Sequence, residues 1–354
     1  MSLNPLVIDK LVAKVPIIQG GMGIGVSLAN LAGAVGREGG IGILSTAQIG
    51  FQEAIFEKSP MRANMEAIKK QFDRAKEIAK GGLIGFNIMA ATFQYERYVK
   101  RCVEVGADVI ISGAGLPITL PELVAGSTTK IAPIVSSNKA AKVLLNTWKK
   151  RYNTTADFVV IEGPEAGGHL GFKAESLSES IEQMDDEIVK IVATVNAFGE
   201  QFDRKIPVIF AGGVFDRSDI ERYLSLGCSG VQMATRFVIT EECDAPEAFK
   251  RSYLEADKDD ITVIKSPVGM PGRAIKNQFT ERIKNERIPI EKCRSCLSYK
   301  HCDRETIPYC ITETLLNAVT ADPRNALVFA GSNAYRLKEK TTVKAIFEEL
   351  TKER

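Results

Sequence analysis

Residues 206–237 read IPVIFAGGVFDRSDIERYLSLGCSGVQMATRF and contain two successive units of the same kind. An apolar run at Val208–Ala211 leads through a glycine pair into a helical pattern at Asp216–Leu226, and a second apolar run follows at Gly230–Met233. Continuous apolar runs, rather than alternating ones, are typical of strands buried on both faces of a parallel sheet. This stretch therefore predicts parallel strands connected by helices.

The same alternation continues toward the N-terminus. Six further strand-like runs lie at Val15–Gln19, Ile41–Leu44, Leu83–Met89, Val109–Ser112, Ile131–Val135 and Phe158–Glu162. Helical patterns separate several of them, at Ala63–Lys80, Tyr95–Val105, Lys139–Arg151 and Asp185–Phe198. Eight such units predict an α/β fold of the (β/α)8 TIM barrel type, with a doubly wound sheet as the competing arrangement.

After Met233 the pattern changes. Residues 241–324 combine helix-like stretches, a segment rich in proline and glycine at Ser266–Gly272, and a cysteine-rich segment. We expect a smaller, mainly helical C-terminal subdomain there. The barrel would then comprise residues 1–240 and 325–354, with a last helix near Thr342–Glu348 packing back on it.

Composition narrows the class of protein. Apolar residues make up 45% of the chain and charged residues 25%, and the net charge is +2. The basic residues are scattered, so no nucleic-acid partner is indicated. The longest apolar runs are too short for a membrane helix, and residues 1–5 do not resemble a signal peptide. We therefore expect a cytoplasmic protein whose partner is a small-molecule substrate and whose seven cysteines are reduced thiols or metal ligands.

In parallel barrels the active site lies at the carboxyl ends of the strands. Glycines follow the first predicted strand at Gly20–Gly25, and Gly212-Gly213 follows the seventh. Glycine allows a backbone to approach a ligand closely. The turns at Gly212-Gly213 and Ala234-Thr235 lie where barrels commonly bind phosphate, so they predict a phosphate site; simple tight turns are the alternative. Arg236 either neutralises that phosphate or forms a structural ion pair.

His169 is one of only two histidines, and Gly167 and Gly168 precede it. Imidazole, with an ordinary pKa of about 6.5, is the usual agent of proton transfer at neutral pH. We therefore interpret His169 as a general acid or base, with a structural loop histidine as the alternative. Glu165 either orients His169 or is solvated.

Five motifs together resemble one family: PIIQGGMG, GFNIM, EGPEAGGHLG, IFAGGV and GCSGVQMATRF, in this order. The chain resembles the nitronate monooxygenase (2-nitropropane dioxygenase) family, FMN-dependent (β/α)8 enzymes that include the flavin-type enoyl-acyl-carrier-protein reductases. The resemblance covers most of residues 5–280 and resumes near residues 330–332.

By this resemblance His169 takes the place of the family's catalytic histidine. The resemblance also implies an FMN site. Its flavin ring would lie against Gly20, Gly21 and Met22, and Asn87 and Glu162 would make polar contacts to FMN. Gly167 and Gly168 are also expected to belong to the FMN-binding residues. The ribityl phosphate would be surrounded by Gly212, Gly213, Gln232, Ala234 and Thr235.

The family carries out two kinds of reaction. Nitronate monooxygenases oxidise alkyl nitronates with oxygen to a carbonyl compound and nitrite, whereas the reductases pass hydride from NAD(P)H through FMN to an enoyl thioester. EAGGHLG and GRAIKNQF are closer to the reductases, and GGMGIGVS and the C-terminal extension are closer to the monooxygenases. We favour nitronate oxidation, with enoyl or quinone reduction as the alternative. A non-catalytic flavin- or metal-binding regulator is the hypothesis from another class, and a homodimer stays open.

Four cysteines form a segment that does not match the sequence pattern of either branch of the family. Cys293, Cys296, Cys302 and Cys310 have the spacing C-x2-C-x5-C-x7-C, with His301 beside the third. Thiolates so spaced can form a zinc or iron–sulfur site, and four ordinary reduced thiols are the alternative. The other three, Cys102, Cys228 and Cys243, are expected to be buried as small apolar side chains. The single tryptophan, Trp148, precedes three basic residues and is interpreted as a surface anchor.

Overall fold

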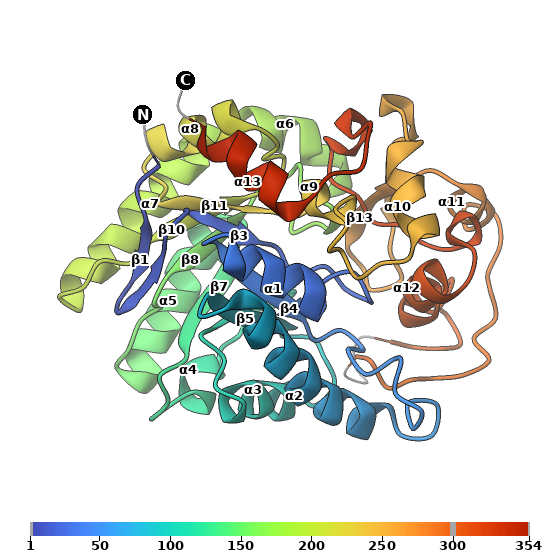
Figure 1. Ribbon diagram of the computed structural model, residues 1–354, viewed down its shortest axis with the longest axis horizontal. Helices are drawn as coiled ribbons and strands as arrows, with labels where there is room; N and C mark the ends of the chain where they lie inside the picture. The colour runs from blue at the N-terminus through green and yellow to red at the C-terminus, as the bar shows by residue number, and fades with distance from the viewer. Residues whose placement is uncertain (1–2, 298–301, 353–354) are drawn as a thin grey trace.

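The computed structural model describes residues 3–297 and 302–352 and contains a closed barrel of eight parallel strands (Figure 1). This arrangement confirms the predicted (β/α)8 barrel and excludes the doubly wound sheet, because the last strand pairs with the first. Each of the eight predicted runs is a strand. They are β3 (Ile17–Gln19), β4 (Ile41–Ser45), β5 (Leu83–Met89), β6 (Val109–Gly113), β7 (Lys130–Val135), β8 (Val159–Glu162), β10 (Val208–Ala211) and β11 (Gly230–Met233).

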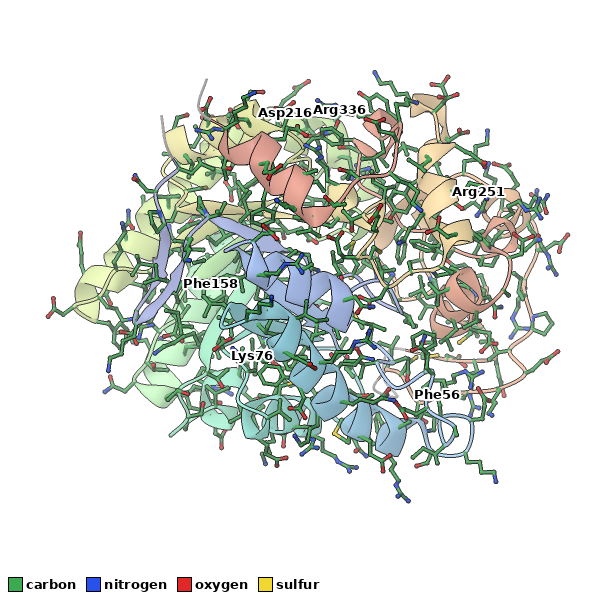
Figure 2. The ribbon with its side chains drawn as sticks, in the orientation of Figure 1. Phe56, Lys76, Phe158, Asp216, Arg251 and Arg336 are labelled. Atoms are coloured by element: carbon green, nitrogen blue, oxygen red, sulfur yellow. The ribbon has the colours of Figure 1, made fainter. Side chains whose placement is uncertain are left out.

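The barrel interior is filled by branched and aromatic side chains. Ile18, Ile43, Ile209 and Phe158, which is labelled in Figure 2, belong to one buried cluster. An antiparallel hairpin of β1 (Leu6–Ile8) and β2 (Leu11–Ala13) adds its buried side chains to the same cluster. The hairpin therefore closes the amino end of the barrel and leaves the carboxyl end as the open mouth.

Helices cover the outside of the barrel. They are α1 (Ala29–Arg37), α2 (Pro60–Ala79), α3 (Tyr95–Glu104), α4 (Leu120–Leu123), α5 (Asn138–Tyr152), α6 (Leu177–Glu182), α7 (Met184–Gln201), α8 (Arg217–Ser225) and α9 (Thr235–Val238). Local signals explain several boundaries. Ser137 accepts a hydrogen bond from the Ala140 N–H at the start of α5, and Asp216 and Asp219 form a capping box at the start of α8.

The chain returns to the barrel at its end. Helix α13 (Val343–Thr351) buries Val343, Ile346, Phe347 and Leu350 in the main core, and in Figure 1 it lies across α1. Arg236 forms an ion pair with Glu349 on this helix at 2.6 Å, so the structural alternative for Arg236 is the one observed. A second ion pair, between Arg336 and the α8 cap Asp216, is labelled in Figure 2.

Residues 241–324 contain a small sheet as well as helices. The helices are α10 (Glu247–Leu254), α11 (Gln278–Arg282) and α12 (Ile311–Thr320), grouped at one side of the barrel in Figure 1. Between them, β12 (Ile261–Lys265) and β13 (Pro271–Ile275) form an antiparallel hairpin, and β13 also pairs with β9 (Gly168–His169) from a barrel loop. Sequence analysis did not predict this three-stranded sheet. Short 3-10 helices lie at Ala174–Ser176, Lys258–Asp260, Pro323–Asn325 and Ala334–Arg336.

Among the helices that the structure describes, none is long and apolar enough to cross a membrane.

The interpretation of Trp148 as a surface anchor is wrong. Its side chain is fully buried, and its indole N–H donates to the Pro117 carbonyl at 3.2 Å. Trp148 follows Ala141, Leu144 and Leu145 at helical spacing, so it lies on the buried face of α5 while the basic residues after it point outward. The basic residues that follow Trp148 in the sequence made this row of apolar residues hard to recognise.

We expect the substitution Trp148→Ala to lower the free energy of unfolding by about 3–5 kcal/mol, because it leaves a large cavity in a packed core. The measurement is urea unfolding followed by far-ultraviolet circular dichroism, since the substitution removes the only tryptophan fluorophore. Val143→Ala on the exposed face of the same helix is the control and should change stability by less than about 0.5 kcal/mol. Equal effects of the two substitutions would contradict the buried placement.

Candidate active site

The first loop at the barrel mouth lies flat against neighbouring strands. The Gly20 N–H donates to the Met233 carbonyl at 2.8 Å, and a Cβ added to Gly21 would lie 2.4 Å from the Cβ of Asn87. Any larger residue at position 21 would force the loop away from β5. The next residue, Met22, is held by its backbone N–H, which donates to the Ser27 hydroxyl at 2.9 Å. The predicted ring-binding residues are therefore brought together.

The two turns predicted to bind phosphate are brought together by residues 330–333. Gly212 and Gly213 both have positive φ, 111° and 80°, which favours glycine at these positions. The side-chain amide of Asn333 donates to the Gly213 carbonyl at 2.6 Å, and the Gly331 N–H donates to the Thr235 hydroxyl at 3.3 Å. The turn after β10 and the turn after β11 thus share one wall.

Gln232 presents an unsatisfied polar atom beside these turns. It lies on β11, and a Cβ on Gly20 would be 3.5 Å from its Cγ. Its side-chain oxygen is buried and has no hydrogen-bond partner within residues 3–297 and 302–352. A buried amide oxygen left without a donor costs free energy, so this atom indicates a ligand that supplies an N–H or O–H group.

The loop after β8 folds back over the barrel. Glu162 ends the strand and accepts a hydrogen bond from the Gly171 N–H at 3.0 Å. Burial raises the pKa of Glu162 to about 7. Gly167 is packed so closely that an added Cβ would lie 2.6 Å from the Ala330 carbonyl carbon, and Gly168 has a φ of 79°. These glycines let the loop approach residues 330–333 and turn into β9.

His169 lies in β9, where it pairs with Gly272 of β13. Its Nε2 is 2.7 Å from the hydroxyl oxygen of Ser266, which is itself buried. The ring meets Phe329 edge to face, with centroids 5.0 Å apart. Burial lowers the pKa of His169 to about 4, so the imidazole is neutral at physiological pH. The sequence pointed to His169 but not to its partner Ser266.

Glu165 has neither of the two predicted roles. Its carboxylate accepts a hydrogen bond from the Ser332 hydroxyl at 3.1 Å, so it is neither bonded to His169 nor simply solvated.

Arg273 of β13 is a further residue that sequence analysis missed. It is buried and donates to the carbonyls of Pro164 and Ala166 at 2.8 and 2.6 Å, which holds the loop after β8 in place. Ser266 begins the segment rich in proline and glycine at Ser266–Gly272, and Arg273 directly follows it.

A cavity of about 590 Å³ opens beside His169. One wall is the segment after His169 and the other is the β12–β13 hairpin. Most of its side chains are apolar, and its three charged side chains are the exposed Lys173, Lys265 and Glu175. The lining residues are Leu170, Gly171, Phe172, Lys173, Ala174, Glu175, Val263, Ile264, Lys265, Gly269, Met270 and Pro271.

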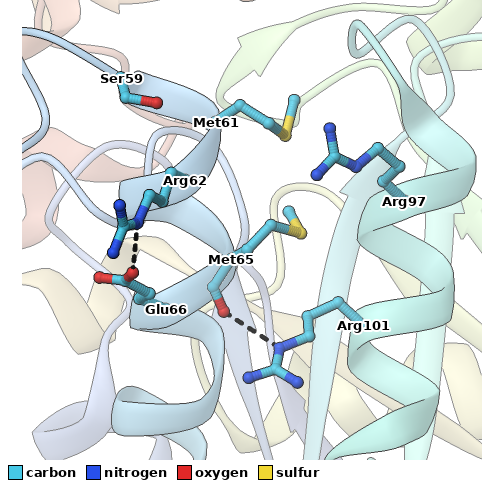
Figure 3. Close-up of a pocket in the computed structure, with 7 residues that line it drawn as sticks. All are labelled: Ser59, Met61, Arg62, Met65, Glu66, Arg97 and Arg101. Atoms are coloured by element: carbon cyan, nitrogen blue, oxygen red, sulfur yellow. Dashed lines mark hydrogen bonds and ion pairs between the residues drawn. The ribbon is translucent and has the colours of Figure 1, made fainter.

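A second hollow, of about 460 Å³, lies on the outer wall between α2 and α3 (Figure 3). Two of its arginines already have partners: Arg62 pairs with Glu66 at 2.8 Å, and Arg101 donates to the Met65 carbonyl at 3.1 Å. None of the predicted site residues lines either hollow, but the one at Leu170 and the β12–β13 hairpin directly adjoins His169 in sequence and through the β9–β13 pairing. The cavity beside His169 is therefore the candidate substrate site.

All seven cysteines are free thiols, and Cys102, Cys228 and Cys243 are buried as expected. Cys293, Cys296, Cys302 and Cys310 all lie within the described residues, whereas His301 lies outside them. In the part of the chain that the structure describes, no three His, Cys, Asp or Glu side chains are grouped so that they could hold a metal ion. The metal prediction for these four cysteines stays a prediction.

Comparison with known proteins adds independent findings. The chain matches the family model described as Nitronate monooxygenase over residues 4–353. It is 29% identical over 274 residues to the (3aS,4S,5R,7aS)-5-hydroxy-7a-methyl-1-oxo-octahydro-1H-indene-4-carboxyl-CoA dehydrogenase of Mycobacterium tuberculosis, covering 76% of this chain and 65% of that protein, slightly less than two thirds of its length. A probable nitronate monooxygenase of Staphylococcus saprophyticus is 24% identical, over 80% of this chain and 81% of that one. The solved structure of FabK from Thermotoga maritima has a TM-score of 0.71 at 25% identity, covering 95% of this chain and 91% of that chain.

We expect His169 to titrate far below the ordinary range. In the unfolded chain its pKa is near 6.5 and in the folded chain about 4, so the unfolded chain binds more protons between these values. The contribution of His169 to stability is therefore complete above pH 6.5 and is lost as the pH falls toward 4. Between pH 7 and pH 5 the protein should lose about 2 kcal/mol relative to the variant His169→Asn.

The direct measurement is the imidazole proton signal in NMR, which is simple because the chain has two histidines and His301→Gln assigns the remaining one. A His169 signal that titrates near pH 6.5 would contradict the buried, neutral imidazole. Glu162 acts in the opposite direction, because its folded pKa of about 7 lies above its ordinary 4.5; its contribution is complete below pH 4.5 and is lost as the pH rises toward 7. Glu162 is present in both proteins, so it cancels in the comparison.

Proposed function

Because this chain belongs to the nitronate monooxygenase family of flavin-dependent oxidoreductases, we propose that it binds FMN and acts on the α,β carbon–carbon bond of an acyl thioester, as an enoyl reductase using NAD(P)H. The observation that carries this proposal is the cavity of about 590 Å³ beside His169, whose lining is mostly apolar and includes two lysines and one glutamate.

The residues at the barrel mouth fit FMN. Gly20 and Gly21 let the first loop pack closely against Gln232 and Asn87, and the unpaired oxygen of Gln232 would accept a hydrogen bond from a donor on the cofactor. Gly212, Gly213, Ala234 and Thr235, in the two turns that contact residues 331–333, would surround the phosphate. Asn87 lies near the carboxyl end of β5, Glu162 is the last residue of β8, and Met22 lies in the first loop. Bound FMN supplies hydride transfer, and the protein supplies position and polarity.

The cavity favours an acyl thioester over a small nitronate. A volume of about 590 Å³ matches a ligand of drug size, whereas an alkyl nitronate of a few carbons would leave most of it unfilled. Leu170, Phe172 and Ile264 suit an acyl chain. Lys173 and Lys265 suit the phosphate groups of coenzyme A or of a carrier-protein arm. The similarity to a carboxyl-CoA dehydrogenase supports the same substrate class.

The neutral His169 suits a neutral substrate. Nε2 is occupied by Ser266, and Nδ1 makes no hydrogen bond to the described protein residues. A neutral imidazole N–H can polarise a carbonyl oxygen in a buried site. We infer that Ser266 is a positioning residue, which fixes the ring so that Nδ1 meets the thioester carbonyl. An uncharged ring gives no electrostatic attraction to an anionic nitronate, which makes nitronate binding less favourable.

Nitronate oxidation is the second candidate. It is favoured by the family match over residues 4–353 and by the similarity to the probable nitronate monooxygenase of Staphylococcus saprophyticus. For this activity His169 would act as base toward a neutral nitroalkane, since a nitronate has already lost its proton.

We expect flavin reduced anaerobically with NADH or NADPH to be reoxidised by octenoyl-CoA, and His169→Asn to retain flavin but slow this step by roughly 10²–10⁴-fold. The measurement is flavin absorbance in stopped flow. The comparison reaction is aerobic turnover of propyl-2-nitronate by the same preparation. Rapid nitronate turnover together with no reoxidation by enoyl thioesters would reverse the order of the two candidates.

We also expect the double substitution Lys173→Ala with Lys265→Ala to raise the KM for octenoyl-CoA about three- to tenfold, because two exposed charge contacts to phosphate are lost. The KM for the corresponding N-acetylcysteamine thioester should not change, since that substrate has no phosphate. Lys142→Ala, on the exposed face of α5, is the matched control. An equal rise for both thioesters would mean that the lysines shape the cavity rather than bind phosphate.

A further inference from the structure

The first loop at the barrel mouth rests on two buried polar side chains that the proposed function does not use. Gln19 is the last residue of β3, Ser27 lies two residues before α1, and neither is exposed to solvent. Successive residues of a strand face opposite sides, so Gln19 faces the helices as Ile17 does, whereas Ile18 belongs to the cluster inside the barrel. Neither polar side chain can therefore touch a ligand at the mouth.

The Gln19 amide makes all its hydrogen bonds inside the protein. Its oxygen accepts from the Ile43 N–H at 3.0 Å, which fixes the other amide atom as the nitrogen. That nitrogen donates to the Ser27 hydroxyl at 2.8 Å and to the Gly20 carbonyl. The side chain therefore links β4, the residue before α1 and the first loop in one buried network.

Two donors hold the Gly20 carbonyl from the buried side. It accepts from the Gln19 amide and from the Ser27 hydroxyl, the latter at 3.3 Å. All peptide bonds of the described residues are trans. In a trans peptide the carbonyl of one residue and the N–H of the next point in opposite directions. The Gly21 N–H therefore points away from Gln19 and Ser27.

This N–H has no acceptor in the protein. Within residues 3–297 and 302–352 the Gly21 N–H forms no hydrogen bond, whereas the N–H groups of Gly20 and Met22 donate to the Met233 carbonyl and the Ser27 hydroxyl. Gly21 is only partly exposed, and the loop is pressed so closely onto Asn87 that a Cβ would not fit. An unpaired N–H fixed in this way is a donor for a ligand.

We propose that Gln19 and Ser27 are positioning residues, which turn the Gly20 carbonyl inward and thereby present the Gly21 N–H to the flavin ring as a fixed hydrogen-bond donor. This inference rests on the proposed binding of FMN and adds two residues that do not touch it. The isoalloxazine ring carries acceptors at its carbonyl oxygens and ring nitrogens. A donor that is already oriented binds such a ring more tightly, because less freedom is lost on binding.

The test uses FMN and riboflavin, which share the ring and differ in the phosphate. In the complete chain freed of flavin, Gln19→Met keeps the length of the side chain and removes its hydrogen bonds. We expect it to raise the dissociation constants of both flavins by the same factor, about three- to tenfold, since one hydrogen bond to the ring is weakened. The measurement is titration followed by flavin fluorescence.

Asn64→Leu is the matched control. Asn64 is a buried amide on α2 that also makes three hydrogen bonds, to Gly50, Gln48 and Tyr98. Its loss removes a polar network of similar size that does not hold the first loop. We expect the dissociation constants of FMN and riboflavin to change by less than about twofold in this variant.

Nuclear magnetic resonance of protein labelled with 15N-glycine observes the donor directly. In the parent protein, FMN should protect the Gly21 amide from exchange with solvent. In Gln19→Met the same amide should exchange freely even when FMN is saturating, because its peptide is no longer held. A variant that had only lost stability would still protect this amide once FMN is bound.

The outcomes separate this proposal from the proposed function. Unchanged dissociation constants in folded Gln19→Met would overturn it, and so would a rise for FMN alone, which would place the effect at the phosphate. Equal protection of the Gly21 amide in both proteins would also overturn it. If circular dichroism shows that Gln19→Met is unfolded, Ser27→Ala replaces it, with the same expected rise. A parent protein that binds neither flavin would overturn the proposed function itself, together with this inference.

Discussion

The pairing of β9 with β13 is the contact on which the site depends. It joins a two-residue strand in a barrel loop to a hairpin about a hundred residues later in the chain, with Gly168 opposite Arg273 and His169 opposite Gly272. Arg273, also on β13, donates hydrogen bonds to two backbone carbonyls of the loop after β8. Without this pairing, His169 would sit on an unsupported glycine-rich loop. With it, the imidazole, Ser266 and the cavity wall have fixed relative positions.

Burial acts on two titratable groups of this site in opposite ways. It lowers the pKa of His169 to about 4 and raises that of Glu162 to about 7, and in both cases it favours the neutral form. The centre of the site therefore carries little fixed charge, and positive charge is left to the exposed lysines at the cavity. Such a division suits a ligand with an apolar, uncharged reactive part and an anionic remote part.

The barrel could be predicted from the sequence because its signal is local. Each strand is a continuous apolar run, and each run is followed by turn residues and a helical pattern within the same short stretch. The importance of glycines such as Gly21 and Gly212 could also be predicted, because a single glycine after a strand already indicates a turn or a close approach of the backbone. The polar residues that bond to His169 and Glu165 could not be predicted from the sequence. Ser266 meets His169, and Ser332 meets Glu165, across long separations in sequence, and neither residue type is unusual in itself. Trp148 was wrongly assigned to the surface because the basic residues beside it drew attention away from the helical spacing of apolar residues along α5.

Residues 330–333 form the shared wall of the turns after β10 and β11, and they follow all eight barrel strands in the sequence. Asn333 reaches the turn after β10, Gly331 reaches the turn after β11, and α13 then seals the barrel against α1. A chain still being translated has all eight strands well before it has this wall. Domains begin to fold from the N-terminus during synthesis, so the barrel can assemble first and leave its mouth incomplete. The two turns therefore receive their shared wall only when residues 330–333 dock, so this part of the site is completed later than the strand order of the barrel.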